Sequence, residues 1–459
     1  MRLALATPLP PATSGIADYA DELAPHLAAG AELTLFHEGA AAPAAALAAR
    51  FACRPVAELP AALARGSFDG VVYQLGNSAA HHEQIYRLLL EHPGVVVLHE
   101  YMLHHLVREL TLVRGDAAAY VEEMRYAAGD TGRAAARRLL DTHYPVDVWA
   151  FPLFERVVDR SLGVLVHSEF CRSRLLASRP RARVGCLPMP VDLDALRPPD
   201  EAERAAARAA LGVAAEAPLI ATFGFVTPNK HLEPALAGFA RLRAARPEAR
   251  FAVVGEVSRH YDFDEVLARC GAEGVTVTGR VPLERLHDWM IACDVALNLR
   301  HPTGGETSAT LFRLLALARP TLVSAAGSFA ELPEGAVAKV EVGPDEAEQI
   351  FALLDRLAAD RDLAAALGRA GRREVERGHA LPAVAARCLE FVRETLAGAA
   401  TPEAAVPPLA PWDEKDRATA LLASVGADLA DLGLDEQEAA LGEVAAALVE
   451  LGLAGPEAV

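Results

Sequence analysis

The chain has 459 residues, which is enough for two or three domains with a real hydrophobic core. Hydrophobic residues make up 52% of the chain and charged residues 23%, a composition that excludes wholesale disorder. The formal net charge of -18 excludes the basic surface that a general nucleic-acid binder needs, so we expect no nucleic-acid partner.

Short, β-rich apolar runs alternate with longer helical patterns as far as about residue 400, and this order is typical of βαβ units around parallel sheets. We therefore predict an α/β protein. In chain order, the first series of predicted strands is 2–7, 32–37, 70–76, 95–99, 163–167 and 183–187. The second series is 219–224, 250–256, 275–278, 295–299, 321–324 and 337–342.

The two series predict two domains, 1–190 and 200–396, joined by a proline-containing linker around 188–200. Between about 104 and 160 the strand pattern gives way to helix, so we expect a helical insertion in the first domain.

Residues 401–459 form an acidic tail in which twelve acidic residues face only two basic ones, after a linker rich in proline and alanine. Near its end, apolar residues recur at helical spacing at Leu441, Val444, Leu448 and Leu451. This amphipathic helix either packs on the parent body or associates with a second chain, which would make the protein a homo-oligomer.

Six cysteines are scattered without a C-x-x-C pair, which argues against a zinc ribbon and a disulfide framework and fits a reducing compartment. We find no signal peptide and no apolar run long enough to span a membrane. We therefore expect a cytoplasmic protein.

The loop after the first strand does not contain the G-x-G-x-x-G fingerprint of dinucleotide binding, which disfavours a hydride-transfer enzyme. It ends in Ser14-Gly15 at the start of a predicted helix. A missing side chain and free backbone N–H groups would let an anion or a sugar approach Gly15 closely. A turn glycine without any ligand explains the segment equally well.

His99 stands at the carboxyl end of a predicted parallel strand, where side chains point toward the ligand crevice of such sheets. The following His104 is one residue too distant for the H-E-x-x-H zinc motif, so we reject a zinc site. Asp192 and Asp194 form a D-x-D pattern at the domain boundary, away from any loop suited to a nucleotide. We interpret this pair as capping within the linker and predict no required metal.

In the second domain, the first predicted strand runs into a loop that contains Asn229 and Lys230. The chain has only three lysines among its 44 basic residues, so a lysine at this place is unusual. Beside a helix N-terminus it would meet a diphosphate as a point charge. The alternative is a solvated surface lysine, and in both cases we expect an exposed loop side chain.

The most informative constellation is the strand-to-helix turn that contains Gly304, Gly305, Glu306, Thr307 and Ser308. Its glycines offer backbone N–H groups to phosphate oxygens, and its carboxylate and hydroxyls suit sugar hydroxyl groups. Alternatively, Thr307 or Ser308 only caps the next helix and Glu306 lies in solvent, which would leave the two glycines unexplained.

Together these segments resemble the retaining glycosyltransferases of the GT-B fold, specifically the large fourth family, over residues 1–396. The phrases that carry the resemblance are 14–19 (SGIADY), 166–168 (VHS), 190–192 (PVD), 278–282 (TGRVP), 292–297 (ACDVAL) and 319–323 (RPTLV). The resemblance implies two facing Rossmann-like domains with parallel sheets, followed here by the C-terminal helical tail.

In that family an arginine and a lysine hold the diphosphate. Lys230 matches the lysine, whereas Phe225 occupies the arginine position. Counting back from Pro320 places the two glutamates of the E-x7-E motif at Gly305 and Arg313, so Glu306 matches the first only with a shift of one residue. The second glutamate, which binds the ribose, is absent.

The resemblance also assigns roles to individual residues. Glu306 would orient sugar hydroxyls, His99 would contact the transferred sugar, and Lys230 would stabilise the leaving diphosphate. The backbone of Arg280 and Val281 would recognise the nucleobase edge, and Arg313 would compensate for the missing arginine. The remaining donor-binding candidates are Gly15, Asn229, Gly304, Gly305, Thr307 and Ser308.

The expected function is transfer of a sugar from a nucleotide diphosphate sugar to an acceptor hydroxyl with retention of configuration, without a cofactor or metal. The acceptor would be an unidentified glycan, lipid-linked, peptide or small-molecule compound. Two alternatives stay open: a nucleotide-sugar epimerase or hydrolase on the same fold, and a non-catalytic GT-B scaffold that binds partners through its tail.

Overall fold

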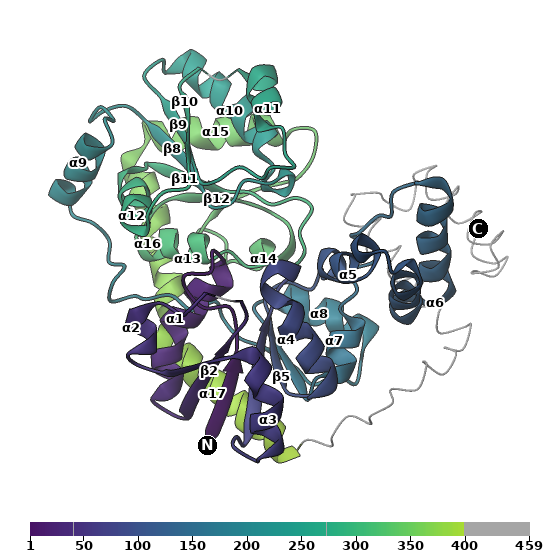
Figure 1. Cartoon of the computed structure of the whole chain (residues 1–459). Helices are drawn as coiled ribbons and strands as arrows, with labels where there is room; N and C mark the ends of the chain where they lie inside the picture. Colours follow the sequence, from purple (N-terminus) through teal and green to yellow (C-terminus); the bar gives the residue numbers. More distant parts are fainter. Residues whose placement is uncertain (40, 272, 399–459) are drawn as a thin grey trace, which may run out of the picture. The chain divides into compact units, whose positions relative to one another are not determined.

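The computed structural model describes residues 1–398 with the exception of residues 40 and 272, and within this part it contains two parallel β-sheets (Figure 1). The predicted tail helix, and with it the predicted self-association, lies outside the described residues. Among the helices of the described part, none combines the length and the apolar character needed to cross a membrane.

The first sheet has seven strands in the order β3-β2-β1-β4-β5-β6-β7. Its strands are β1 (Arg2–Ala6), β2 (Glu32–His37), β3 (Ala52–Pro55), β4 (Gly70–Leu75), β5 (Val95–Leu98), β6 (Gly163–Val166) and β7 (Val184–Cys186). The α-helices of this half are α1 (Gly15–Ala28), α2 (Ala45–Ala48), α3 (Leu59–Ala64), α4 (Ala79–Glu91), α5 (His104–Leu110), α6 (Ala117–Thr142), α7 (Glu155–Arg160) and α8 (Glu169–Ser178). Two short 3₁₀ helices, η1 (Val56–Glu58) and η2 (Leu112–Arg114), complete it.

The second sheet has six strands in the order β10-β9-β8-β11-β12-β13. Its strands are β8 (Leu219–Phe223), β9 (Arg250–Val254), β10 (Val275–Gly279), β11 (Val295–Asn298), β12 (Thr321–Ser324) and β13 (Ala338–Val340). The helices from here to residue 398 are α9 (Glu201–Ala210), η3 (Pro228–Lys230), α10 (Leu232–Ala245), α11 (Phe263–Cys270), α12 (Leu283–Ala292), α13 (Ala309–Ala316), α14 (Gly327–Ala330), α15 (Glu346–Ala359), α16 (Arg361–Gly378) and α17 (Leu381–Gly398).

Both faces of each sheet are buried, as expected for parallel strands covered by crossover helices. On β1, Leu3 and Leu5 pack with α1 and α17, whereas Ala4 and Ala6 point to the opposite face and pack with α4. In the second sheet, Ile220 of β8 packs with α10 and α15 on one face. This alternation produced the apolar runs from which the strands were predicted.

The final described helix, α17, returns to the first sheet. Leu389 of α17 belongs to the same core cluster as Leu3, and a Cβ at Gly185 of β7 would lie 2.8 Å from Phe391. Glycine at this position therefore permits the close approach of α17. The predicted second domain, 200–396, includes this helix, which in space covers the first sheet.

The predicted helical insertion between 104 and 160 contains α5, α6 and α7. His104 is buried within it, and its ring nitrogens lie 2.6 Å from the Phe151 carbonyl oxygen and 2.9 Å from the Tyr120 hydroxyl. His104 is thus a packing residue of the insertion.

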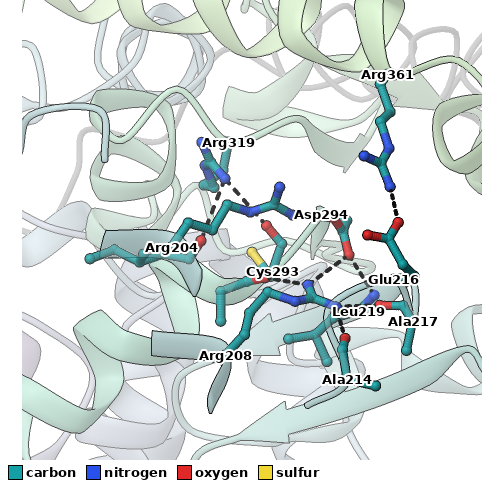
Figure 2. Close-up of polar contacts among 12 residues, drawn as sticks. Arg204, Arg208, Ala214, Glu216, Ala217, Leu219, Cys293, Asp294, Arg319 and Arg361 are labelled. Atoms are coloured by element: carbon teal, nitrogen blue, oxygen red, sulfur yellow. Dashed lines mark hydrogen bonds and ion pairs between the residues drawn. The ribbon is translucent and has the colours of Figure 1, made fainter. Parts of the chain in front are cut away.

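Polar contacts at the amino ends of the second-sheet strands attach α9 to the sheet (Figure 2). Asp294, just before β11, accepts the Leu219 backbone N–H at 2.7 Å and pairs with Arg204 and Arg208 of α9. The buried Arg208 also donates to the Ala292 carbonyl oxygen at 2.9 Å. Asp294 is therefore the shared acceptor of this network.

The D-x-D pattern at the domain boundary is a local turn. Asp192 Oδ1 accepts the backbone N–H groups of Asp194 and Ala195 at 3.1 and 2.9 Å. The interpretation of this segment as linker capping is confirmed.

Candidate active site

Loops from the carboxyl ends of the two sheets meet at one place. The turn after β11 contributes the Gly304 carbonyl oxygen, which accepts the Tyr101 backbone N–H at 2.9 Å from the loop after β5. The Cys171 thiol of α8 lies 3.2 Å from the Gly305 carbonyl oxygen. Since ligands of parallel sheets bind at the carboxyl ends of the strands, this junction is the natural candidate site.

The two glycines of this turn are explained by packing. Gly305 has φ +77°, and a Cβ there would overlap Cys171 Sγ and lie 2.5 Å from Tyr101 Cδ1. The Gly304 N–H donates to Glu306 Oε2 at 2.7 Å, and the Gly305 N–H donates to Thr303 Oγ1 at 3.1 Å. Both amides are thus engaged inside the turn, whereas the sequence suggested that they were available for phosphate oxygens.

Glu306 is held by contacts from both sides of the turn. Its Oε1 accepts from Asn229 Nδ2 at 3.4 Å and lies 3.5 Å from Arg300 Nε. Its Oε2 accepts the Thr303 hydroxyl at 2.9 Å in addition to the Gly304 N–H. The alternative in which Glu306 lies in solvent is therefore wrong, and the structure brings the predicted residues Asn229 and Glu306 together.

The hydroxyl groups of Thr307 and Ser308 in this turn differ in their hydrogen bonding. Ser308 is the N-cap of α13: its Oγ accepts the Leu311 N–H at 3.3 Å and donates to Asn298 Oδ1 at 2.8 Å. The capping alternative thus holds for Ser308. Thr307 Oγ1 is enclosed and has no hydrogen-bond partner among the described residues, which leaves it as a polar group that a ligand can satisfy.

Lys230 is buried, with only 5% of its surface exposed, so the expectation of an exposed loop lysine is wrong. Its Nζ donates to the Phe223 carbonyl oxygen at 2.6 Å. A Cβ at Gly224, where φ is +90°, would lie 3.3 Å from this Nζ. Burial and the neighbouring Arg300 lower the pKa of Lys230 well below its usual value, while Glu306 opposes this shift. The loop folds back onto the strand end, and residue type alone does not reveal this.

Arg300 is a second buried cation that the sequence reasoning missed. It is 9% exposed, its Nη1 donates to the Leu299 carbonyl oxygen at 2.9 Å, and its Nε faces Glu306. Burial lowers its pKa, and Glu306 opposes this shift. By contrast, Phe225, at the position of the family's arginine, is 55% exposed. An arginine directly after an apolar strand was the available signal for Arg300.

Glu100, directly after His99, is the second residue that the sequence reasoning missed. Its Oε1 accepts the Asn77 backbone N–H at 3.2 Å. Burial and the nearby Glu306 raise the pKa of Glu100 to about 8, although the Asn77 hydrogen bond opposes this shift. Glu100 follows the same predicted strand as His99, so its position indicated a site residue as strongly as that of His99 did.

The predicted residue His99 lies on the first-sheet side of the junction. Its Nε2 is 3.2 Å from Gln74 Oε1, and its ring centroid is 4.8 Å from that of Tyr19 and 5.0 Å from that of His167. Burial and the neighbouring histidines lower the pKa of His99 well below its usual value. His99 is thus a neutral, fixed ring beside Glu100.

The other donor-binding candidates lie around α1 and β10. Arg313 of α13 forms an ion pair with Glu22 of α1, so a diphosphate contact by Arg313 would need this pair to open. Arg280 is exposed. Burial raises the pKa of Asp18 of α1, and the nearby Arg313 and Arg280 oppose this shift. The two remaining candidates differ in their surroundings: a Cβ at Gly15 would meet open space, and Val281 is partly buried against the core of the second sheet.

Within the described part of the chain, no group of three or more His, Cys, Asp or Glu side chains is arranged to hold a metal ion.

Two comparisons of the sequence with known proteins gave matches. A family model described as "Glycosyl transferase-like" matches residues 237–390. A curated relative is 26% identical over 280 residues, which cover 59% of this chain and 72% of the relative. It is the GDP-mannose-dependent monoacylated alpha-(1-6)-phosphatidylinositol monomannoside mannosyltransferase of Corynebacterium glutamicum.

Solved structures show the same fold. Anabaena HepE in complex with UDP matches with a TM-score of 0.60 and 13% identity, covering 86% of this chain and 100% of that one. Sucrose-phosphate synthase from Thermosynechococcus elongatus matches with a TM-score of 0.60 and 16% identity, covering 87% of this chain and 100% of that one. The chain therefore has the GT-B fold, as predicted.

The family match over residues 237–390, the curated relative and this fold make the chain similar to glycosyltransferases of group 1. The more specific placement in the fourth family of retaining enzymes stays a prediction.

Proposed function

We propose that the protein transfers a sugar from a nucleotide diphosphate sugar to an acceptor hydroxyl with retention of configuration, and that Lys230 and Arg300 receive the diphosphate. The observation that carries this proposal is the charge balance at the junction. Two buried basic side chains share Glu306 as their neighbouring carboxylate, and burial lowers the pKa of both, whereas burial and the nearby Glu306 raise the pKa of Glu100 to about 8. Buried charge without full compensation is costly, and an anionic ligand would relieve that cost.

These cations also suit the chemistry of the leaving group. Negative charge develops on the diphosphate as the bond to the anomeric carbon breaks, and fixed positive groups in a buried site stabilise that charge strongly. Because Lys230 and Arg300 supply this charge, we propose that transfer needs no divalent metal and no cofactor. In this arrangement Arg300 takes the place of the arginine that Phe225 replaces.

The resemblance implies a front-face reaction for the transfer step. The bond between the anomeric carbon and the diphosphate oxygen breaks, and the acceptor oxygen bonds to the same face of that carbon. The acceptor proton passes to the leaving phosphate oxygen, so no separate base is needed. Glu306, fixed by Asn229, Thr303 and Gly304, is placed to accept hydrogen bonds from sugar hydroxyls.

The similar proteins suggest the first donors to test. The Corynebacterium relative is named as dependent on GDP-mannose, and HepE was solved with UDP. We therefore propose GDP- and UDP-sugars as the donor class, and an acceptor that presents a hydroxyl group. A cytoplasmic location agrees with the six free thiols.

A screen of GDP-mannose, UDP-glucose and other nucleotide sugars by thermal shift, followed by product analysis, tests this function. We expect one donor to stabilise the full chain, and its sugar to appear in an α- or β-linkage that matches the donor anomer, also in the presence of EDTA. An interconverted nucleotide sugar would indicate an epimerase, and free sugar with every acceptor would indicate a hydrolase. Failure of every nucleotide to bind would favour the scaffold.

A further inference from the structure

The N-terminus of α8, in the first-sheet half of the chain, is capped partly by a side chain from the second-sheet half. Within α8, Ser168 Oγ accepts the Cys171 backbone N–H at 3.2 Å, as an N-cap residue does. Glu331, which directly follows α14, accepts the two preceding N–H groups. Its Oε2 accepts that of Glu169 at 3.0 Å, and its Oε1 accepts that of Phe170. The first three N–H groups of α8, which have no partner inside the helix, are thus all satisfied.

The negative charge of Glu331 suits this position. An α-helix carries partial positive charge at its N-terminus, and a carboxylate there forms charge-assisted hydrogen bonds. Glu169 is the acidic neighbour that opposes this contact, and it pairs with Arg172 of the same helix at 3.2 Å. The repulsion between the two carboxylates is therefore partly offset.

Both helices of this contact also touch the turn of the candidate site. On the side of α8, Cys171 Sγ lies 3.2 Å from the Gly305 carbonyl oxygen. On the side of α14, Ser328 Oγ donates to the Glu306 carbonyl oxygen at 2.8 Å. Figure 1 shows α8 and α14 facing each other, and the hydrogen bonds of Glu331 join them. The Glu331 contact thus lies next to the place where the two sheets meet.

The two halves are connected by two chain segments that lie side by side. The Val191 backbone N–H, in the segment after β7, donates to the carbonyl oxygen of His379, between α16 and α17, at 2.8 Å. His379 Nδ1 lies 2.8 Å from the Met189 carbonyl oxygen. Connections gathered at one place permit the two halves to rotate about it, so contacts elsewhere between the halves determine how firmly they stay together.

We propose that Glu331 and the first turn of α8 form a latch, which holds the first-sheet half against the turn at Gly304–Ser308 and whose release lets the two halves separate. This inference goes beyond the proposed function, because it concerns the conformation of the chain without any ligand. The alternative is a helix cap that stabilises only the start of α8.

Hydrogen exchange of the full chain without ligand, measured by mass spectrometry on peptides, separates these two roles. The reporter is the Tyr101 N–H, which donates to the Gly304 carbonyl oxygen at 2.9 Å and joins the two halves from a loop outside α8. Glu331 is exposed, so Glu331→Ala leaves the hydrophobic core intact. We expect this variant to speed exchange at Tyr101 about tenfold, because the loss of hydrogen bonds to a charged group raises the population of the separated form.

Two control variants isolate the contact between the halves. Ser168→Ala removes the N-cap that α8 has within its own half and leaves Glu331 in place, so it should speed exchange only at the start of α8. Glu334→Ala removes an ion pair with Lys339 within the second-sheet half, three residues after Glu331. It should change exchange neither at Tyr101 nor in α8.

Unchanged exchange at Tyr101 in Glu331→Ala would overturn the inference and leave Glu331 as a helix cap. An equal increase at Tyr101 in Ser168→Ala would overturn it as well, because loosening the start of α8 would then suffice to separate the halves. Since no nucleotide is present in this experiment, neither result decides the proposed function, which the nucleotide screen tests on its own.

Discussion

Replacing Lys230 with methionine separates ligand binding from stability. The two side chains are of similar length, so the change removes the charge and the hydrogen bond from Nζ to the Phe223 carbonyl oxygen while filling most of the same space. A hydrogen bond to a charged group contributes about 1.5–3 kcal/mol. We therefore expect the affinity for the nucleoside diphosphate to fall about 10- to 100-fold.

The free energy of unfolding of Lys230→Met, unlike its affinity for the diphosphate, should not fall. Burial lowers the pKa of Lys230 well below 10.5, so the folded state disfavours the protonated amine. The unfolded state then binds the proton more tightly, and the wild type gains stability as the pH rises from its folded-state pKa toward 10.5. Lys230→Met lacks this gain and should be at least as stable as the wild type near pH 7.

Chemical denaturation and calorimetry on the same preparations provide the test. Lys339→Met is the matched control, because Lys339 of β13 lies outside the junction, donates to the Ala330 carbonyl oxygen at 2.9 Å and pairs with Glu334. The control should leave diphosphate affinity unchanged. The reasoning is refuted if Lys230→Met binds the diphosphate as the wild type does and is destabilised by several kcal/mol.

Three further substitutions test the close contact at Gly305, the Asp294 network at the amino ends of the second-sheet strands, and the ion pair of Arg313. Gly305→Ala should lower the free energy of unfolding by about 3 kcal/mol or more in denaturant titrations. The control is Gly212→Ala, where φ is +68° but a Cβ would meet open space, and it should lower that free energy by about 1–2 kcal/mol. Equal losses of stability in the two variants would contradict the close contact at Gly305. Asp294→Ala leaves the buried Arg208 without its carboxylate and should cost about 3–5 kcal/mol of unfolding free energy without changing diphosphate affinity. A variant as stable as the wild type would argue against the anchoring role of Asp294. Glu22→Ala should lower the free energy of unfolding by less than about 1 kcal/mol. If the freed Arg313 reaches the diphosphate, this variant should also bind the diphosphate more strongly, and weaker binding would exclude that contact.

Most of the sheet structure could be predicted because buried parallel strands produce continuous apolar runs. Runs such as 219–224 and 250–256 coincide with β8 and β9. The edge strand Ala52–Pro55 escaped prediction, since its sequence ACRP contains an arginine and a proline and no apolar run. The position of α17 on the first sheet was equally hidden, because hydrophobic periodicity predicts a helix but not the sheet that it covers.

The site was predictable only in part. The turn at Gly304–Ser308 stood out by composition, and Asn229 and Glu306 do meet there. The burial of Lys230 depends on the loop folding back to the Phe223 carbonyl oxygen, which a linear pattern does not contain. Arg300 becomes informative only when its neighbours from distant segments are known.

Glu100 illustrates the same limit. Burial raises the pKa of its carboxyl group, and a turn about two hundred residues later adds to this shift by bringing Glu306 nearby. This pairing follows from the approach of the two sheets, and residue spacing within one domain gives no sign of it.

Calorimetric titration of the full chain with GDP, UDP and their monophosphates tests the central claim most directly. If Lys230 and Arg300 receive a diphosphate, one nucleoside diphosphate should bind with a stoichiometry of one, at least about tenfold more tightly than its monophosphate, and Arg300→Gln should remove this advantage. Equal affinities for the two nucleotides, or an unchanged advantage in Arg300→Gln, would contradict the account.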